Sequence, residues 1–230
     1  MNNYTVDDIA NSLNNEVVLL NLKWEIYRGL FNCSQRQALL CCAAPILFTL
    51  LQKLLLDDIA ITLCRITDSA ETKTKSETHQ NNTLYQLLSK KGLDQKSLDK
   101  VKKNLDEVKI ELNPVRTLRN KFIAHKDLDL TLEHFLANTS DSVTTFSLNF
   151  PLSLENIGVV IEKINGVMND ATNQHVLYNH IRTPYGPDGG VKTLIDHLKA
   201  ALFYESLRKM DKFDSSNFYE DWQHFEHKNA

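Results

Sequence analysis

The chain has 230 residues, of which 42% are hydrophobic and 24% are charged, so it suits one large globular domain with a real core. Its formal net charge is -3 with histidine neutral, whereas a dedicated non-specific nucleic-acid binder is usually basic, so any RNA contact is expected to be local. With only 7 glycines and 5 prolines, the chain lacks the turns of a strand-rich fold, and an all-α domain is predicted.

The first predicted element is a helix from Thr5 to about Phe31. Thr5 can cap it, and Asp7 and Asp8 place negative charge at the positive end of the helix dipole. Apolar residues recur at three- to four-residue spacing and indicate one buried face: Ile9, Leu13, Val17, Leu20 and Trp24. The residues before it have neither the basic nor the apolar segment of a secretory signal.

A second helix is predicted from Ser34 to about Ser69, with Pro45 as a kink or as its true start. Its most apolar run, Ala38 to Leu56, contains Gln52 and Lys53, so we expect a central helix buried in a bundle and not a membrane span. The cysteines of this region show no metal-ligand spacing, and free thiols packed in the core of a cytoplasmic protein are expected: Cys33, Cys41, Cys42 and Cys64.

Shorter helices and polar connections follow. Residues 69–82 are polar and predicted to form a loop. Helices are predicted over 83–91, 94–112 and 114–126, the last capped by Asn113 with Pro114 in its first turn. Residues 130–136 suggest another turn of helix, and residues 138–153 have an alternation that predicts a short hairpin or a loop.

The last predicted helices cover residues 153–178 and 191–210, and a proline- and glycine-rich break at 181–190 separates them. We therefore expect a helical bundle over residues 1–180 and a C-terminal extension over 181–230, within a single domain. The tail carries aromatic residues that predict packing on the bundle or on a partner: Phe213, Phe218, Tyr219, Trp222 and Phe225.

Arg119 and His125 form the first candidate site. An arginine can hold a phosphate through its planar fork, and a histidine can move a proton near neutral pH, so the pair can cleave RNA without a metal. On one helix, however, a separation of six places the side chains about 120° apart and about 9 Å along the axis. The alternative is a solvated Arg119 and a His125 that favours a helix C-terminus.

A polar stripe on the earlier helix is the second candidate. Asp58, Thr62, Arg65 and Ser69 follow helical spacing within an apolar segment. Such charges are expected to be paired or to face a cavity. Two interpretations stay open: a buried Asp58–Arg65 pair that fixes helix packing, or the polar floor of a site with Arg65 as a second phosphate contact.

Two stretches resemble a known family. The string LRNKFIAHKD resembles the R-x(4–6)-H signature of the HEPN superfamily, with Arg119, Asn120 and His125 at the matching positions. The stretch LLLDDIAITLCRITD resembles the abortive-infection U-type subgroup, in which an acidic residue and an "RxTD" element lie on the earlier helix. Arg65, Thr67 and Asp68 match that element.

The resemblance implies an all-α bundle of four to five core helices that forms a homodimer with a composite site. It also implies a metal-independent endoribonuclease, without a cofactor, in phage defence or a toxin–antitoxin system with a cognate antitoxin protein. By position, Arg119 would bind phosphate, His125 would be the acid/base and Asn120 would orient them. The expected substrate-binding residues are Arg65, Asp58, Lys121 and Lys126.

Two other functions stay open. The chain could be a non-catalytic helical dimer that binds RNA, a nucleotide or a protein partner in the same cleft, or a purely structural dimer. A nuclease needs Arg119 and His125 exposed in one cleft, whereas a binding module keeps its affinity when His125 is replaced by alanine.

Overall fold

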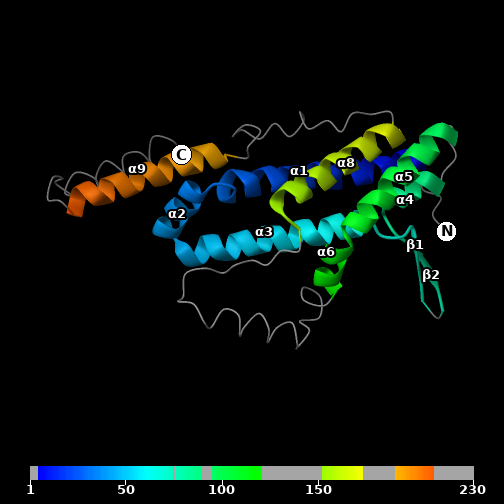
Figure 1. Ribbon diagram of the computed structural model, residues 1–230, viewed down its shortest axis with the longest axis horizontal. Helices are drawn as coiled ribbons and strands as arrows, with labels where there is room; N and C mark the ends of the chain where they lie inside the picture. Colours follow the sequence, from blue (N-terminus) through cyan, green and yellow to red (C-terminus); the bar gives the residue numbers. More distant parts are fainter. Residues whose placement is uncertain (1–4, 75, 90–94, 121–151, 173–189, 210–230) are drawn as a thin grey trace.

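The computed structural model describes residues 5–74, 76–89, 95–120, 152–172 and 190–209 (Figure 1). The helices are α1 (Val6–Phe31), α2 (Ser34–Ala43), α3 (Pro45–Ile66), α4 (Leu84–Ser89), α5 (Gln95–Glu111), α6 (Asn113–Leu118), α8 (Leu154–Thr172) and α9 (Val191–Lys209), and the strands are β1 (Glu71–Lys73) and β2 (Thr78–Gln80). The predicted all-α fold is therefore confirmed. Within these ranges, no helix combines the length and apolar character that crossing a bilayer requires.

Helices α1 and α3 lie side by side and antiparallel in the centre of the bundle (Figure 1). Helix α1 begins with the expected cap, because Thr5 Oγ1 accepts a hydrogen bond from the Asp8 N–H at 3.1 Å and Asp8 Oδ2 accepts one from the Thr5 N–H at 2.9 Å. Its predicted apolar face is buried at Leu13, Val17, Leu20 and Trp24. Opposite it, Ile59, Leu63 and Ile66 of α3 are fully buried.

Helices α5 and α8 form the second antiparallel pair, and α8 packs on α1 (Figure 1). The predicted stripe of α5 is buried at Val101, Leu105 and Val108, and that of α8 at Ile157, Ile161 and Ile164. Short helix α6 turns off the end of α5 toward the end of α3 (Figure 1). This placement brings the chain from Asn113 to Asn120 next to the end of α3.

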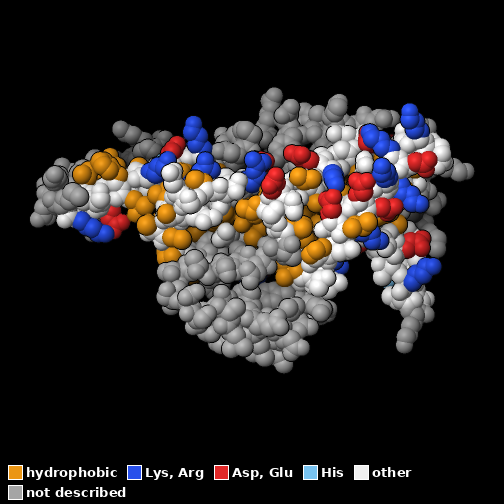
Figure 2. Space-filling model, viewed as in Figure 1, with side chains coloured by type: hydrophobic (Ala, Val, Ile, Leu, Met, Phe, Trp, Pro, Cys, Tyr) orange, Lys and Arg blue, Asp and Glu red, His pale blue; other side chains and the backbone are white. Residues whose placement is uncertain are grey.

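The predicted helix from Ser34 to Ser69 is two helices, because Pro45 begins a new one. Proline has no N–H to donate and fits the first turn, so α2 ends at Ala43 and α3 starts at Pro45. The expectation of a fully buried Ala38–Leu56 segment is wrong. Only one side of α3 packs on α1 and α2, and Ile46, Leu47, Leu50 and Leu54 are exposed. Figure 2 shows hydrophobic side chains gathered over α2 and the start of α3.

Residues 69–82 contain a small antiparallel hairpin where a loop was predicted. Strands β1 and β2 pair Glu71 with Gln80 and Lys73 with Thr78. Thr74 closes the turn, because its Oγ1 accepts a hydrogen bond from the Glu77 N–H at 3.0 Å and its N–H donates to the Glu77 carbonyl at 2.8 Å. The sequence pattern does not predict this hairpin, because its residues have low hydrophobicity and every residue of both strands is exposed.

All four cysteines are free thiols, as predicted, but only Cys64 is buried. Cys41 and Cys42 are exposed and Cys33 is half-buried. The expectation that they all pack as core residues is wrong, because α2 buries only Leu40. The predicted elements at 121–151, 173–189 and 210–230, including the aromatic tail, lie outside the described residues.

Candidate functional site

The two motifs that the sequence separates meet at the end of α3. Asp68 follows the last turn of α3, and Arg116 and Arg119 lie one turn apart on and just after α6. Asp68 Oδ1 pairs with Arg116 and Asp68 Oδ2 accepts a hydrogen bond from Arg119 Nη1 at 2.8 Å. One carboxylate therefore holds two guanidinium groups, a charge-assisted arrangement stronger than a neutral hydrogen bond.

Arg116 locks α6 onto the end of α3. Its Nη2 donates to the Thr67 carbonyl at 2.9 Å and to Thr67 Oγ1 at 2.6 Å. Its Nη1 also reaches the Cys64 carbonyl at 3.4 Å. The carbonyls at a helix C-terminus have no partner within the helix, and a guanidinium is well suited to satisfy them. The side chain is only 14% exposed, which indicates a structural role.

Arg119 is held from two sides, with part of its guanidinium left open. Its Nε donates to Asn120 Oδ1 at 2.9 Å, while Nη1 is held by Asp68. Among the described residues, Nη2 has no hydrogen-bond partner. The backbone at Arg119 is still helical, with φ -54° and ψ -52°, and the side chain is 23% exposed. A fixed guanidinium with a free edge can bind a phosphate oxygen.

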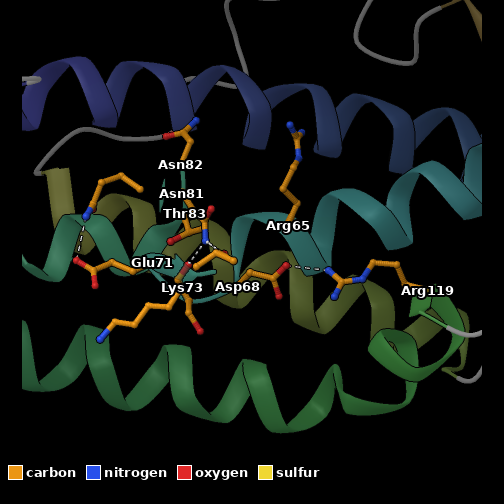
Figure 3. Close-up of a pocket in the computed structure, with 11 residues that line it drawn as sticks. Arg65, Asp68, Glu71, Lys73, Asn81, Asn82, Thr83 and Arg119 are labelled. Carbon is orange, nitrogen blue, oxygen red and sulfur yellow. Dashed lines mark hydrogen bonds and ion pairs between the residues drawn. The ribbon is translucent and has the colours of Figure 1, made fainter. Parts of the chain in front are cut away.

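Arg119 lines a cavity of about 670 Å³. The end of α3, the hairpin and the segment after it form the other walls (Figure 3). Its lining residues are Arg65, Asp68, Ser69, Glu71, Thr72, Lys73, Gln80, Asn81, Asn82, Thr83 and Arg119. Three cations and two carboxylates in this set leave a small positive excess in the lining, although the whole chain is acidic.

The two charges predicted on the earlier helix do not pair with each other. Arg65 pairs with Glu16 of α1 at 2.9 Å, and Asp58 pairs with Lys23 of α1. The interpretation of a buried Asp58–Arg65 pair is therefore wrong, because both side chains are more than half exposed, at 51% and 57%, and α1 offers each a partner. Arg65 lines the cavity, whereas Asp58 is not among its lining residues.

The structure describes only some of the residues predicted around the R-x(4–6)-H signature. Arg119 and Asn120 are described and lie in contact, whereas Lys121, His125 and Lys126 fall outside the described residues. The ranges that the structure covers hold no group of three or more His, Cys, Asp or Glu side chains that could hold a metal ion.

Sequence reasoning missed Arg116 and the hairpin. Arg116 had a detectable signal, because it lies three residues before Arg119 and shares its helix face. No sequence signal indicates Lys73, Asn81 or Asn82 as site residues. Their place at the cavity depends on a hairpin that the composition of residues 69–82 does not predict. The sequence indicates Asp68 only as part of the RxTD element, and its contact with both arginines comes from the fold.

Comparison with known proteins gives one match. The family model of HEPN domains described as AbiU2 matches residues 4–181, which covers α1 to α8 and every cavity residue named above. No curated protein and no solved structure matches the chain.

Proposed function

Because the chain belongs to the AbiU2 family of HEPN domains, we propose that it is a metal-independent endoribonuclease acting in phage defence or as a toxin. The observation that carries the proposal is the guanidinium of Arg119, which Asp68 and Asn120 hold at the edge of a polar cavity. A fixed cation beside a cavity with a positive excess stabilises the charge that develops on a phosphate during cleavage.

The proposed chemistry is attack of a ribose 2′-oxygen on the adjacent phosphorus. His125 takes the proton of the 2′-hydroxyl or returns one to the 5′-oxygen as the P–O5′ bond breaks, which leaves a 2′,3′-cyclic phosphate. Arg119 binds the phosphate through its free Nη2 edge, and Asn120 fixes the guanidinium plane. Arg65, Lys121 and Lys126 bind neighbouring phosphates. Asp58 pairs with Lys23 away from the cavity and acts on the substrate only through its charge.

We also propose that the site is completed by a second copy of the chain in a cytoplasmic homodimer. Exposed apolar residues on α3 support this, because Ile46, Leu50 and Leu54 follow i, i+4 spacing and form one ridge. At helical spacing, Ile61 and Arg65 continue the same face. A partner packed on this ridge would therefore lie next to Arg65, which lines the cavity.

The decisive experiment compares RNA cleavage and growth arrest by wild type, Arg119→Ala and His125→Ala, with a chelator present throughout. Both variants are expected to lose at least about 100-fold in cleavage rate, since each removes a group that acts in the transition state. Matched controls are Arg28→Ala and His197→Ala, which replace an arginine and a histidine exposed elsewhere. The proposal fails if folded wild type cuts no RNA or if both variants cut as fast as their controls.

A non-catalytic RNA-binding dimer is the second candidate. The ion pair between Arg119 and Asp68 favours it, because a guanidinium neutralised by Asp68 stabilises the additional charge of a transition state less than a free one. This function predicts that His125→Ala keeps its affinity for RNA and its effect on cell growth. Equal growth arrest by wild type and His125→Ala, with no RNA cleavage by either, would support this candidate over the nuclease.

A further inference from the structure

The hairpin wall of the cavity has a composition suited to nucleotide binding. Lys73 ends β1, and Asn81, Asn82 and Thr83 follow β2, so one short segment supplies a cation, two amides and a hydroxyl (Figure 3). Opposite this wall stand Arg65 and Arg119 (Figure 3). A ligand that contacts Arg119 and extends through the cavity must therefore pass the hairpin.

The two asparagines are oriented so that each keeps an acceptor unused. Asn81 Nδ2 donates to the Ser69 carbonyl at 2.9 Å, and Asn82 Nδ2 donates to Ser12 Oγ at 2.9 Å and to Glu16 Oε1 at 3.4 Å. Because a carbonyl and a carboxylate only accept, the amide nitrogens must face them. Each Oδ1 then has no hydrogen-bond partner among the described residues and is free to accept one.

Lys73 and Thr83 provide two further unused groups. Lys73 is exposed and has no ion-pair partner among the described residues, unlike Arg65 and Arg119. Thr83 is 1% exposed, and its Oγ1 is buried with no hydrogen-bond partner in the described part of the chain. A buried hydroxyl without a hydrogen-bond partner costs free energy, so a ligand that supplies such a partner gains affinity.

The size and chemistry of the cavity limit the ligand. Its volume of about 670 Å³ is that of a small-molecule pocket, which admits a nucleotide but not a duplex. None of the described lining residues is aromatic. Many single-strand binders stack bases on aromatic side chains, and this cavity would not bind bases in that way. Acceptor oxygens instead suit the N–H groups of a base edge and the ribose 2′-hydroxyl, both accessible in single-stranded RNA.

We propose that the hairpin cavity is a subsite for the nucleotide that flanks the phosphate held by Arg119 in single-stranded RNA. Lys73 binds the phosphate of that nucleotide, Asn82 accepts a hydrogen bond from its 2′-hydroxyl, and Asn81 accepts one from its base edge. The choice of RNA as ligand rests on the proposed function. The subsite adds a means to distinguish RNA from DNA, because only the ribose carries the 2′-hydroxyl.

The test measures binding of a short labelled single-stranded RNA, and of DNA of the same sequence, to the full-length chain carrying His125→Ala to prevent cleavage. For a single strand, removing one phosphate contact lowers the slope of log affinity against log salt concentration by about 0.7. Near 0.1 M salt, this change corresponds to a loss of about fivefold in affinity. Lys73→Ala is expected to show this change, and Lys73→Arg to restore it. Lys103→Ala, on the exposed face of α5, is the matched control.

Asn82→Ala tests the discrimination between RNA and DNA. Loss of one hydrogen bond is expected to weaken RNA binding by about fivefold and to leave DNA binding unchanged. The subsite is refuted if Lys73→Ala keeps the slope of Lys103→Ala, if Asn82→Ala weakens both nucleic acids equally, or if duplex RNA binds with the same dependence on Lys73. Failure of the nuclease proposal gives a different result. In that case the wild type does not cleave RNA, but RNA binding still depends on Lys73.

Discussion

Asp68 and Arg119 are 51 residues apart in the sequence, yet Asp68 Oδ2 and Arg119 Nη1 lie 2.8 Å apart. This contact joins the end of α3 to the end of α6 and fixes the cation that the proposed nuclease needs. Asp68 does not itself reach the substrate in the proposed mechanism. It is a positioning residue, and its loss should lower the cleavage rate through the orientation of Arg119.

Replacing Asp68 by asparagine tests this role. We expect Asp68→Asn to lower the cleavage rate at saturating RNA by about 100-fold with little change in KM, because a misplaced guanidinium loses transition-state contacts. Asp68→Glu should recover part of the rate, since it keeps the charge. A matched control is Asp99→Asn on α5. An unchanged kcat in a folded Asp68→Asn variant would remove Asp68 from the mechanism.

Arg116 should matter for stability. Arg116→Ala removes its bonds to Thr67 and Asp68 and is expected to lower the free energy of unfolding by about 3 kcal/mol, near the lower end for breaking a buried ion pair. Arg116→Lys keeps the charge but not the planar fork and should lose about half as much. Urea denaturation measures both values. Arg28→Ala, on the exposed surface, should change stability by less than about 0.5 kcal/mol, and an equal effect for Arg116→Ala would contradict the structural role.

A composite site predicts rescue in mixed dimers. If each site takes Arg119 from one chain and His125 from the other, a hybrid of Arg119→Ala and His125→Ala chains contains one intact site. Random mixing at equal concentrations makes half of the dimers hybrids, and each hybrid has one intact site out of two. The mixture should therefore recover about one quarter of wild-type cleavage. The measurement is the initial rate after co-refolding or subunit exchange. Full inactivity of a verified hybrid would show that both residues come from the same chain.

The apolar ridge of α3 should hold the dimer together. Leu50→Glu places a charge in the middle of the ridge and is expected to shift the chain from dimer to monomer in sedimentation equilibrium, because an unpaired buried charge is strongly unfavourable. Ile110→Glu on α5 is the control, since Ile110 is also exposed, at 68%, but stands apart from the ridge. If both variants keep the wild-type mass, the ridge is not the interface.

The cysteines should differ in reactivity toward iodoacetamide. Hydrogen bonds from the backbone N–H groups of Arg36 and Gln35 lower the pKa of Cys33, so more thiolate is present near neutral pH. Burial raises the pKa of Cys64 and protects it. Peptide mass spectrometry should find Cys33 labelled first and Cys64 labelled only in denaturant, with exposed Cys41 and Cys42 as references. Early labelling of Cys64 would contradict its burial.

The sequence by itself determined the helical fold, because the spacing of apolar residues on α1, α5 and α8 follows the helix period and decides which faces are buried. It also contained both motifs of the site. The tertiary structure alone decided three relationships. Asp68 meets Arg116 and Arg119 because α6 turns back onto the end of α3, and Asp58 and Arg65 pair with α1 instead of each other. The hairpin forms one wall of the cavity because pairing of β1 with β2 brings Glu71 opposite Gln80 and places Asn81 against Ser69, which local composition does not predict. Long-range contacts of this kind depend on how helices pack, and helix packing is not encoded in the period of any one segment.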